Sequence, residues 1–117
     1  MGRDELVRML VLNEISDDYE SITTINAEVT RVCSHCGLQV TFSEIGQALL
    51  ELIEAGLAKA YVLSSSAPAK EIKWRPSTGE SPDYYFFQTG RGRVAHAENV
   101  AHWPIDENGG LVDHVDL

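Results

Sequence analysis

The sequence predicts a single α+β domain in which three helices are followed by an antiparallel β-hairpin and a last helix. Three features predict this class: a helix marked at both ends, a strand that follows it with almost no loop, and an aromatic strand that leads into another capped helix. The 117 residues are enough for one hydrophobic core, and 44% apolar with 23% charged residues is typical of a globular chain.

The stretch from Val40 to Leu63 supplies the first two features. Thr41 and Glu44 have the S/T-x-x-E spacing of a capping box, in which each side chain accepts a hydrogen bond from the other's backbone amide. Gly56 stands where helices end in a left-handed residue. The apolar residues between these caps recur at helical spacing: Ile45, Ala48, Leu49, Leu52 and Ile53. Residues 59–63 follow as a strand.

Two helices are expected before this stretch. Residues 3–15 carry apolar side chains at i, i+4 and i+8, which predicts a first helix. The β-branched residues 22–25 fit either a short edge strand or the approach to a second helix. We expect that second helix to begin near Thr24 or Asn26 and to close at Gly37.

The chain after Leu63 predicts a long hairpin. Residues 64–68 and 76–82 are rich in Ser, Gly and Pro and are expected to be loops. Between them, residues 70–75 alternate apolar and charged side chains, which fits a short third strand or an extended ribbon. The aromatic run in 83–88 predicts the return strand.

Thr89 can cap a last helix that runs to about Asn99 and ends before Pro104. Its expected apolar side consists of Val94, Ala97, Val100 and Ala101. We divide the chain into a folded domain over residues 1–103 and an acidic tail over 104–117.

The charge distribution is uneven. The net charge of −9 argues against a nucleic-acid partner, because phosphate binding depends on Lys and Arg. Residues 1–57 carry −7 and residues 98–117 carry −5, whereas residues 58–97 carry +3. The hairpin and the start of the last helix are therefore the basic part of an acidic chain.

The sequence shows no pattern typical of an active site, a metal site or a membrane-spanning segment. Cys33 and Cys36 have C-x-x-C spacing, but zinc needs about four ligands and no second cysteine pair exists. The histidines at 96, 102 and 114 show no metal spacing, and no acid/base pair, nucleophile triad or glycine-rich phosphate loop is present. We expect a non-enzyme without cofactor. With no signal peptide or membrane span in the sequence, we place it in the cytoplasm.

The order of elements resembles a winged helix-turn-helix protein. Leu52-x-x-x-Gly56-Leu57 before the hairpin and Tyr85-Phe86-Phe87-Gln88-Thr89-Gly90-Arg91-Gly92 after it are similar in layout to bacterial regulators of the MarR and PadR families, over about residues 4–100. The resemblance implies a homodimer that binds double-stranded DNA, with the third helix in the major groove and the hairpin, or wing, on the backbone.

The resemblance places five residues of the third helix toward the groove: Ser43, Glu44, Gln47, Leu50 and Glu51. Ser43 and Gln47 are the candidate base contacts. The helix contains no Lys or Arg, and Glu44, Glu51 and Glu54 on its exposed side would repel phosphates. In the wing, Lys70, Lys73 and Arg75, with Trp74 among them, are candidates for phosphate contact, the alternative being an ordinary solvated hairpin balanced by Glu71.

Two functions follow. The first is a winged-helix transcriptional regulator in which the wing supplies more of the DNA contact than the third helix. The second is a winged-helix module for protein–protein interaction, which would use the acidic face formed by Glu44, Glu51 and Glu54, or the acidic tail.

Overall fold

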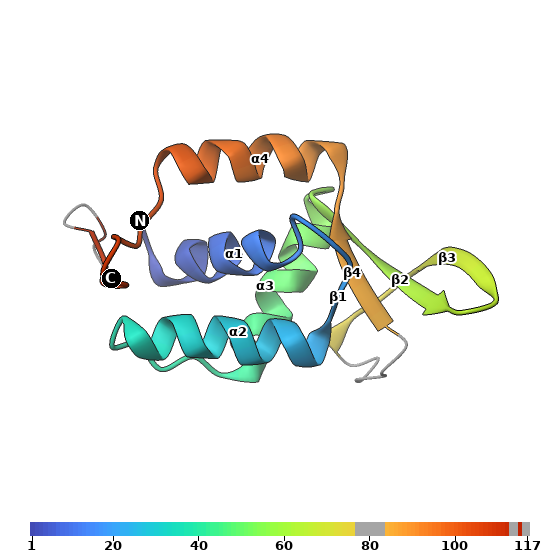
Figure 1. The fold of residues 1–117 in the computed structure, drawn as a ribbon, viewed down its shortest axis with the longest axis horizontal. Coiled ribbons are helices and arrows are strands. Elements are labelled where there is room, and N and C mark those ends of the chain that lie inside the picture. Colours follow the sequence, from blue (N-terminus) through green and yellow to red (C-terminus); the bar gives the residue numbers. More distant parts are fainter. Residues whose placement is uncertain (77–83, 113–114, 116–117) are drawn as a thin grey trace.

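The structure is a computed structural model that describes residues 1–76, 84–112 and 115. The elements follow the predicted order, and the two short strands that the sequence left open, one before the second helix and one within the hairpin, are both present (Figure 1). They are α1 (Arg3–Glu14), β1 (Glu20–Ser21), α2 (Ile22–His35), α3 (Phe42–Glu54), β2 (Ala58–Ser64), β3 (Ala67–Ile72), β4 (Tyr84–Gln88) and α4 (Gly90–Ala101).

The strands form one antiparallel sheet in the order β1-β4-β2-β3. Ala60 of β2 is the register partner of both Phe86 on β4 and Ile72 on β3. The β2–β3 hairpin extends past the helices at one end of the molecule (Figure 1). We call this hairpin, together with residues 73–75 that follow it, the wing.

The core lies between the helices and one face of the sheet. α1 is the central helix, packed by α2, α3 and α4, and it buries apolar residues on several sides (Figure 1). The largest fully buried side chains include Phe86 from the sheet, Leu6 and Leu12 from α1, Ile25 from α2, and Ile45 and Leu49 from α3. Their removal from water is the main stabilising contribution to the fold.

The predicted ends of α3 are confirmed. The Thr41 hydroxyl accepts from the Glu44 amide, and the Glu44 carboxylate accepts from the Thr41 amide, each at 3.1 Å. Gly56 has a φ of 77°, which favours glycine, and the Leu57 amide donates to the Leu52 carbonyl at 2.9 Å. The chain then enters β2 directly.

The predicted start of α2 was wrong by a few residues. The helix begins at Ile22 because Ser21 acts as its N-cap, with the Ser21 hydroxyl accepting from the Thr24 amide at 3.2 Å. Glu20 and Ser21 just before it pair with β4, so the expected edge strand exists but precedes the β-branched residues. Gly37, with a φ of 81°, ends this part of the chain as predicted.

The predicted loop over 64–68 was also wrong in part. β2 continues to Ser64, and Ala67 begins β3 after a turn of two residues, so the segment is a tight hairpin. Of residues 70–75, the expected third strand, Lys70–Ile72 pairs with β2, whereas residues 73–75 lie beyond the end of β3. Most of the second expected loop, 76–82, lies outside the described residues.

The apolar side of α4 was expected to pack on the core, and this prediction was wrong because that side faces solvent. Val94 and Val100 are 62% and 54% exposed, and Ala97 and Ala101 are exposed beside them. The orientation is set at the first turn, where a Cβ on Gly92 would lie 2.0 Å from the Leu57 carbonyl oxygen. This close approach turns the small and polar side of α4 toward α1.

The segment after α4 folds against the end of α2. Ile105 and Leu111 form a β-bridge, and the Asp106 carboxylate accepts from the Asn108 and Gly110 amides at 2.9 and 3.0 Å. The His35 ring lies 3.2 Å from the Asn108 carbonyl oxygen. The division of the chain at residue 103 stays a prediction.

Candidate nucleic-acid interface

One face of α3 is open to solvent. Ser43, Gln47, Leu50 and Glu54 are spaced four, three and four residues apart and therefore lie along one side of the helix. Ser43, Gln47 and Glu54 are exposed and Leu50 is half-buried, whereas the opposite side of α3 enters the core. We call these four residues the open face of α3.

Two of the three glutamates predicted on the exposed side are engaged by α1. Arg3 Nε lies 2.8 Å from Glu44 Oε2, and Arg8 Nη1 lies 2.9 Å from Glu51 Oε2. The hydrogen bond from Arg3 lowers the pKa of the Glu44 carboxyl, which keeps it ionised in this pair. Glu54 forms no ion pair with any residue that the structure describes.

A pocket of about 300 Å³ lies between α1 and α3. The pocket is lined by both candidate base contacts and by both paired glutamates. The lining residues are Asp4, Val7, Ser43, Glu44, Gln47, Ala48 and Glu51. Ser43 and Gln47 are therefore flanked on the α1 side by Glu44 and Glu51, whose charge Arg3 and Arg8 offset. Asp4, the third carboxylate of the lining, forms no ion pair with a described residue.

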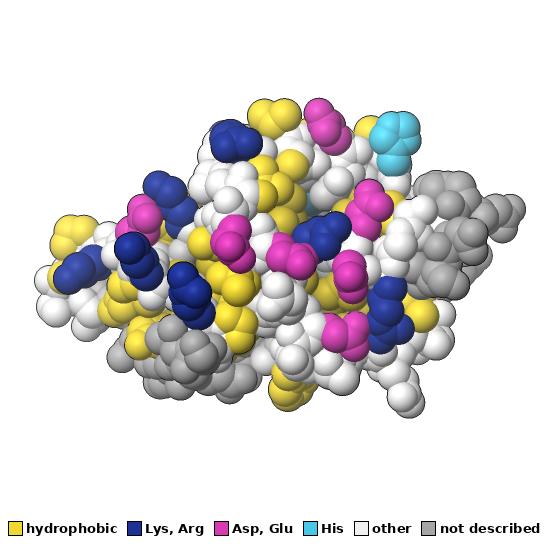
Figure 2. Space-filling view, turned by 180° about the vertical axis from the view of Figure 1, so that it is seen from behind, with side chains coloured by type: hydrophobic (Ala, Val, Ile, Leu, Met, Phe, Trp, Pro, Cys, Tyr) yellow, Lys and Arg dark blue, Asp and Glu magenta, His cyan; other side chains and the backbone are white. Residues whose placement is uncertain are grey.

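The basic side chains of the wing are not all balanced by Glu71. Glu71 pairs with Lys59 of β2, Nζ to Oε1, at 3.0 Å. Lys70 and Lys73 are exposed and form no ion pair with any described residue. Figure 2 shows Lys and Arg side chains gathered over the wing at the left, around one carboxylate, whereas carboxylates predominate over the helices.

The chain that follows β3 passes beside α3. A Cβ on Gly46, which is buried in the first half of α3, would lie 3.7 Å from Cβ and Cγ of Pro76. Lys73 and Arg75 belong to this segment and are exposed. The structure therefore brings basic residues of the wing region to the edge of α3, a contact that the sequence did not predict.

Trp74 does not belong to a surface patch, contrary to the prediction. It is 5% exposed and packs edge-on against Phe86, with ring centroids 5.0 Å apart. Its alternation with charged neighbours was compatible with either face of a strand, and the core takes the aromatic one. Trp74 anchors the segment that carries Lys73 and Arg75, so it can position these side chains without touching a ligand.

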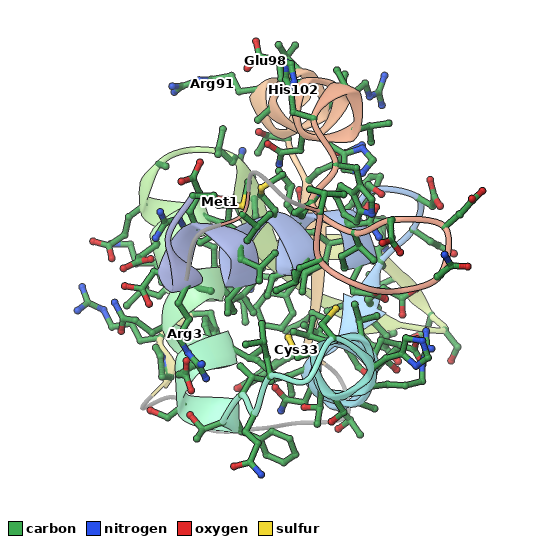
Figure 3. The ribbon with its side chains drawn as sticks, turned by 90° about the vertical axis from the view of Figure 1, so that its left-hand side faces the viewer. Met1, Arg3, Cys33, Arg91, Glu98 and His102 are labelled. Atoms are coloured by element: carbon green, nitrogen blue, oxygen red, sulfur yellow. The ribbon has the colours of Figure 1, made fainter. Side chains whose placement is uncertain are left out.

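The arginines of α4 lie on another part of the surface. In Figure 3, Arg91, Glu98 and His102 project from α4 at the top, whereas Arg3 lies on the other side of α1 beside α3. Arg91 reaches the C-terminal end of α3, with Nη1 3.0 Å from the point where a Cβ on Gly56 would stand. It is therefore far along α3 from Ser43.

The two cysteines are free thiols at the end of α2. Cys33 is buried in the core, and the Cys36 thiol donates to the Gly109 carbonyl at 3.2 Å. Burial raises the pKa of both thiols, which opposes formation of the reactive thiolate. In the part of the chain that the structure describes, no three His, Cys, Asp or Glu side chains gather as metal ligands would.

The architecture defines a class of protein. Three helices around one core, a hairpin that projects beside the third helix, and a helix that returns over the first constitute a winged-helix fold. None of the described helices has the length and apolar content that crossing a membrane requires.

Comparison with solved structures supports this class. The chain is similar to the X-ray structure of a PadR-like transcription factor from Bacteroides fragilis, with a TM-score of 0.57 and 17% sequence identity. The match covers 86% of this chain and 82% of the other. At this identity the likeness establishes the winged-helix fold. No family model and no curated protein matches the sequence.

Proposed function

We propose that the protein is a winged-helix DNA-binding transcriptional regulator. In this proposal α3 enters the major groove, where Ser43 and Gln47 contact base edges. Lys70, Lys73 and Arg75 contact phosphates from the wing region. The observation that carries the proposal is the packing of Pro76 beside Gly46, because it brings the basic segment to the side of α3 next to the open face.

The ion pairs between α1 and α3 weaken the main objection, which is the acidic character of α3. An unpaired carboxylate near phosphates is repelled, whereas one held by a guanidinium contributes little net charge at a distance. Arg3 and Arg8 hold Glu44 and Glu51 in this way. Glu54, at the end of α3 away from Ser43, is the acidic side chain of the open face without such a partner among the described residues.

The exposed side of α4 supports the homodimer. Val94, Ala97 and Ala101 are three and four residues apart, which is the spacing of a seam between two helices. Arg93 and Glu98 flank this seam on opposite sides with opposite charges, so a second copy packed parallel would place each Arg93 close to a Glu98. A two-fold dimer would present two α3 helices to two half-sites.

Fluorescence anisotropy with a mixed-sequence duplex tests the proposal. The wild-type protein should bind at low salt, and the logarithm of its affinity should fall linearly with the logarithm of salt concentration. K70Q/K73Q should reduce that slope by about two, because each lost phosphate contact removes about one unit. R31Q, which removes a charge from α2, is the control and should leave the slope unchanged. Absence of wild-type binding at low salt would contradict the proposal.

A second function, protein–protein interaction, is favoured by one observation. Glu54 and the half-buried Leu50 lie together on the open face of α3, and the net charge of −9 suits a basic partner. Because Glu44 and Glu51 are paired with arginines of α1, the acidic face available to a partner consists of Glu54 and its neighbours. A pull-down should then lose its partner with E54Q and keep it with E28Q, which changes a glutamate on α2. Equal capture by both variants would count against this function.

A further inference from the structure

Phe42, the first residue of α3, leaves most of its ring in solvent. It is 61% exposed, and the other two large hydrophobic side chains found exposed in the described ranges lie on α4, Val94 in the seam and Val100 at its edge. Phe42 lies outside the hydrophobic core and outside the residues packed against it. Within the described residues, the hydrophobic core therefore makes no use of this aromatic ring.

The start of α3 does not need an aromatic residue. Thr41 and Glu44 satisfy the capping amides, and Ile45 is the first residue of the helix that enters the core. The position just after an N-cap accepts most residue types, and a polar one would avoid the exposed apolar area. Folding of the described residues does not explain an aromatic ring at this position, which points to a role in binding.

The location of Phe42 indicates what the ring meets. The N-terminal residues of a recognition helix are those that reach base edges. Ser43 is its neighbour and Gln47 lies just over one turn further along α3. Gly46, one turn from Phe42, is covered by Pro76 of the segment that carries Lys73. Phe42 thus stands where the base-reading residues and the basic segment adjoin.

We propose that Phe42 contacts the C5-methyl group of a thymine in the major groove and makes the protein prefer an A·T pair at that position. This inference rests on the proposed DNA-binding function. The thymine methyl is the apolar group that bases display in the major groove. A phenyl ring placed against the polar edge of guanine or cytosine would remove water without replacing its hydrogen bonds.

The test compares thymine with deoxyuridine, which lacks only the methyl group. A duplex is selected from a random pool with the wild-type protein, and each thymine in it is then replaced in turn by deoxyuridine. At one position per half-site, wild-type affinity should fall about fourfold, the factor expected for losing burial of one methyl group. F42A should bind the thymine and deoxyuridine duplexes equally.

Two variants separate this contact from other effects. F42L keeps an apolar side chain and should retain part of the preference for thymine. K73Q should weaken binding to both duplexes by the same factor, because a phosphate contact does not sense the methyl group. Far-UV circular dichroism should show F42A folded, since Phe42 lies outside the core.

Several outcomes would overturn the inference. If wild-type protein binds all deoxyuridine duplexes as tightly as the parent, Phe42 reads no methyl group, although the DNA-binding proposal stands. If F42A still prefers thymine, the methyl group is read elsewhere. If F42A turns a dimer into a monomer, the ring is covered by a second copy. If no duplex binds, both proposals fail.

Discussion

The guanidinium of Arg8 on α1 lies 2.9 Å from the carboxylate of Glu51 on α3. With the Arg3–Glu44 pair, this contact gives the third helix a more balanced surface than its own sequence suggests. Both pairs are partly exposed to solvent, so their value lies in charge compensation more than in stability. This arrangement makes α1 part of the candidate nucleic-acid interface.

Breaking the pair should therefore affect DNA binding more than folding. R8Q leaves the Glu51 carboxylate without its partner, and we expect weaker duplex binding in the anisotropy assay with a small change in unfolding midpoint. R8Q/E51Q should recover most of the lost affinity. R31Q, which breaks the Arg31–Glu28 pair on α2 with the same charge change, is the control. A double variant as weak as R8Q would contradict this role.

Glu14 provides a test of electrostatic cost. Burial, with Glu28 and Glu20 nearby, raises the pKa of the Glu14 carboxyl in the folded protein. Its ionised form therefore destabilises the fold at pH values above the folded pKa, and this cost disappears as the pH falls and the group is protonated. E14Q should raise the urea midpoint at pH 7 and match the wild type near pH 4.

Glu44 should show the opposite sign and serves as the control for Glu14. Its pKa is lowered by the Arg3 hydrogen bond, so its stabilisation is present above the unfolded pKa of about 4.3 and is lost as the pH falls through the folded pKa. E44Q, which keeps an oxygen for the cap, should lower the midpoint at pH 7 and have little effect at low pH. Equal pH profiles for E14Q and E44Q would refute both assignments.

The seam on α4 predicts the oligomeric state. Wild-type protein should sediment as a dimer, and V94E/V100E should sediment as a monomer because it places one carboxylate in the apolar seam and a second at its edge. F42E makes the same kind of change on α3 and should leave the dimer intact. If the wild-type protein stays monomeric at all concentrations, the proposal that α4 forms a dimer interface is wrong.

Trp74 should behave as a core residue with a positioning role. W74A should cost about 3–5 kcal/mol in unfolding free energy, and W74F much less because it keeps a ring against Phe86. The buried Trp74 Nε1 has no hydrogen-bond partner among the residues that the structure describes, so W74F also removes a donor left unsatisfied there. If W74A unfolds at the wild-type urea concentration, the ring does not belong to the core.

Local signals predicted much of the fold. The capping box at Thr41, the left-handed Gly56 and the Thr89 cap act within a few residues, so their spacing in the sequence is enough to recognise them. The same reasoning failed for α4, where helical periodicity marked the apolar stripe. The close approach of Gly92 to the Leu57 carbonyl, a contact between distant residues, decides which side faces α1.

The candidate site depended more on tertiary contacts. Arg3 and Glu44 are 41 residues apart, and no pattern in either helix indicates that they meet. Trp74 alternates with charged residues in a way that fits both faces of a strand. It lies beyond the end of β3 at Ile72, so only its tertiary packing against Phe86 decides its burial. The sequence predicted which residues of α3 lie outside the core. It did not predict which of them contact α1 and which form the open face.

The central claim is that one surface, formed by the start of α3 and the basic segment after β3, binds duplex DNA. Titrating the ¹⁵N-labelled protein with a mixed-sequence duplex at low salt tests this directly by NMR. The account predicts that amide shifts change at Ser43, Gln47, Lys70 and Lys73 and stay unchanged at Glu28 and Arg31. An unchanged spectrum, or changes confined to α2 or α4, would contradict it.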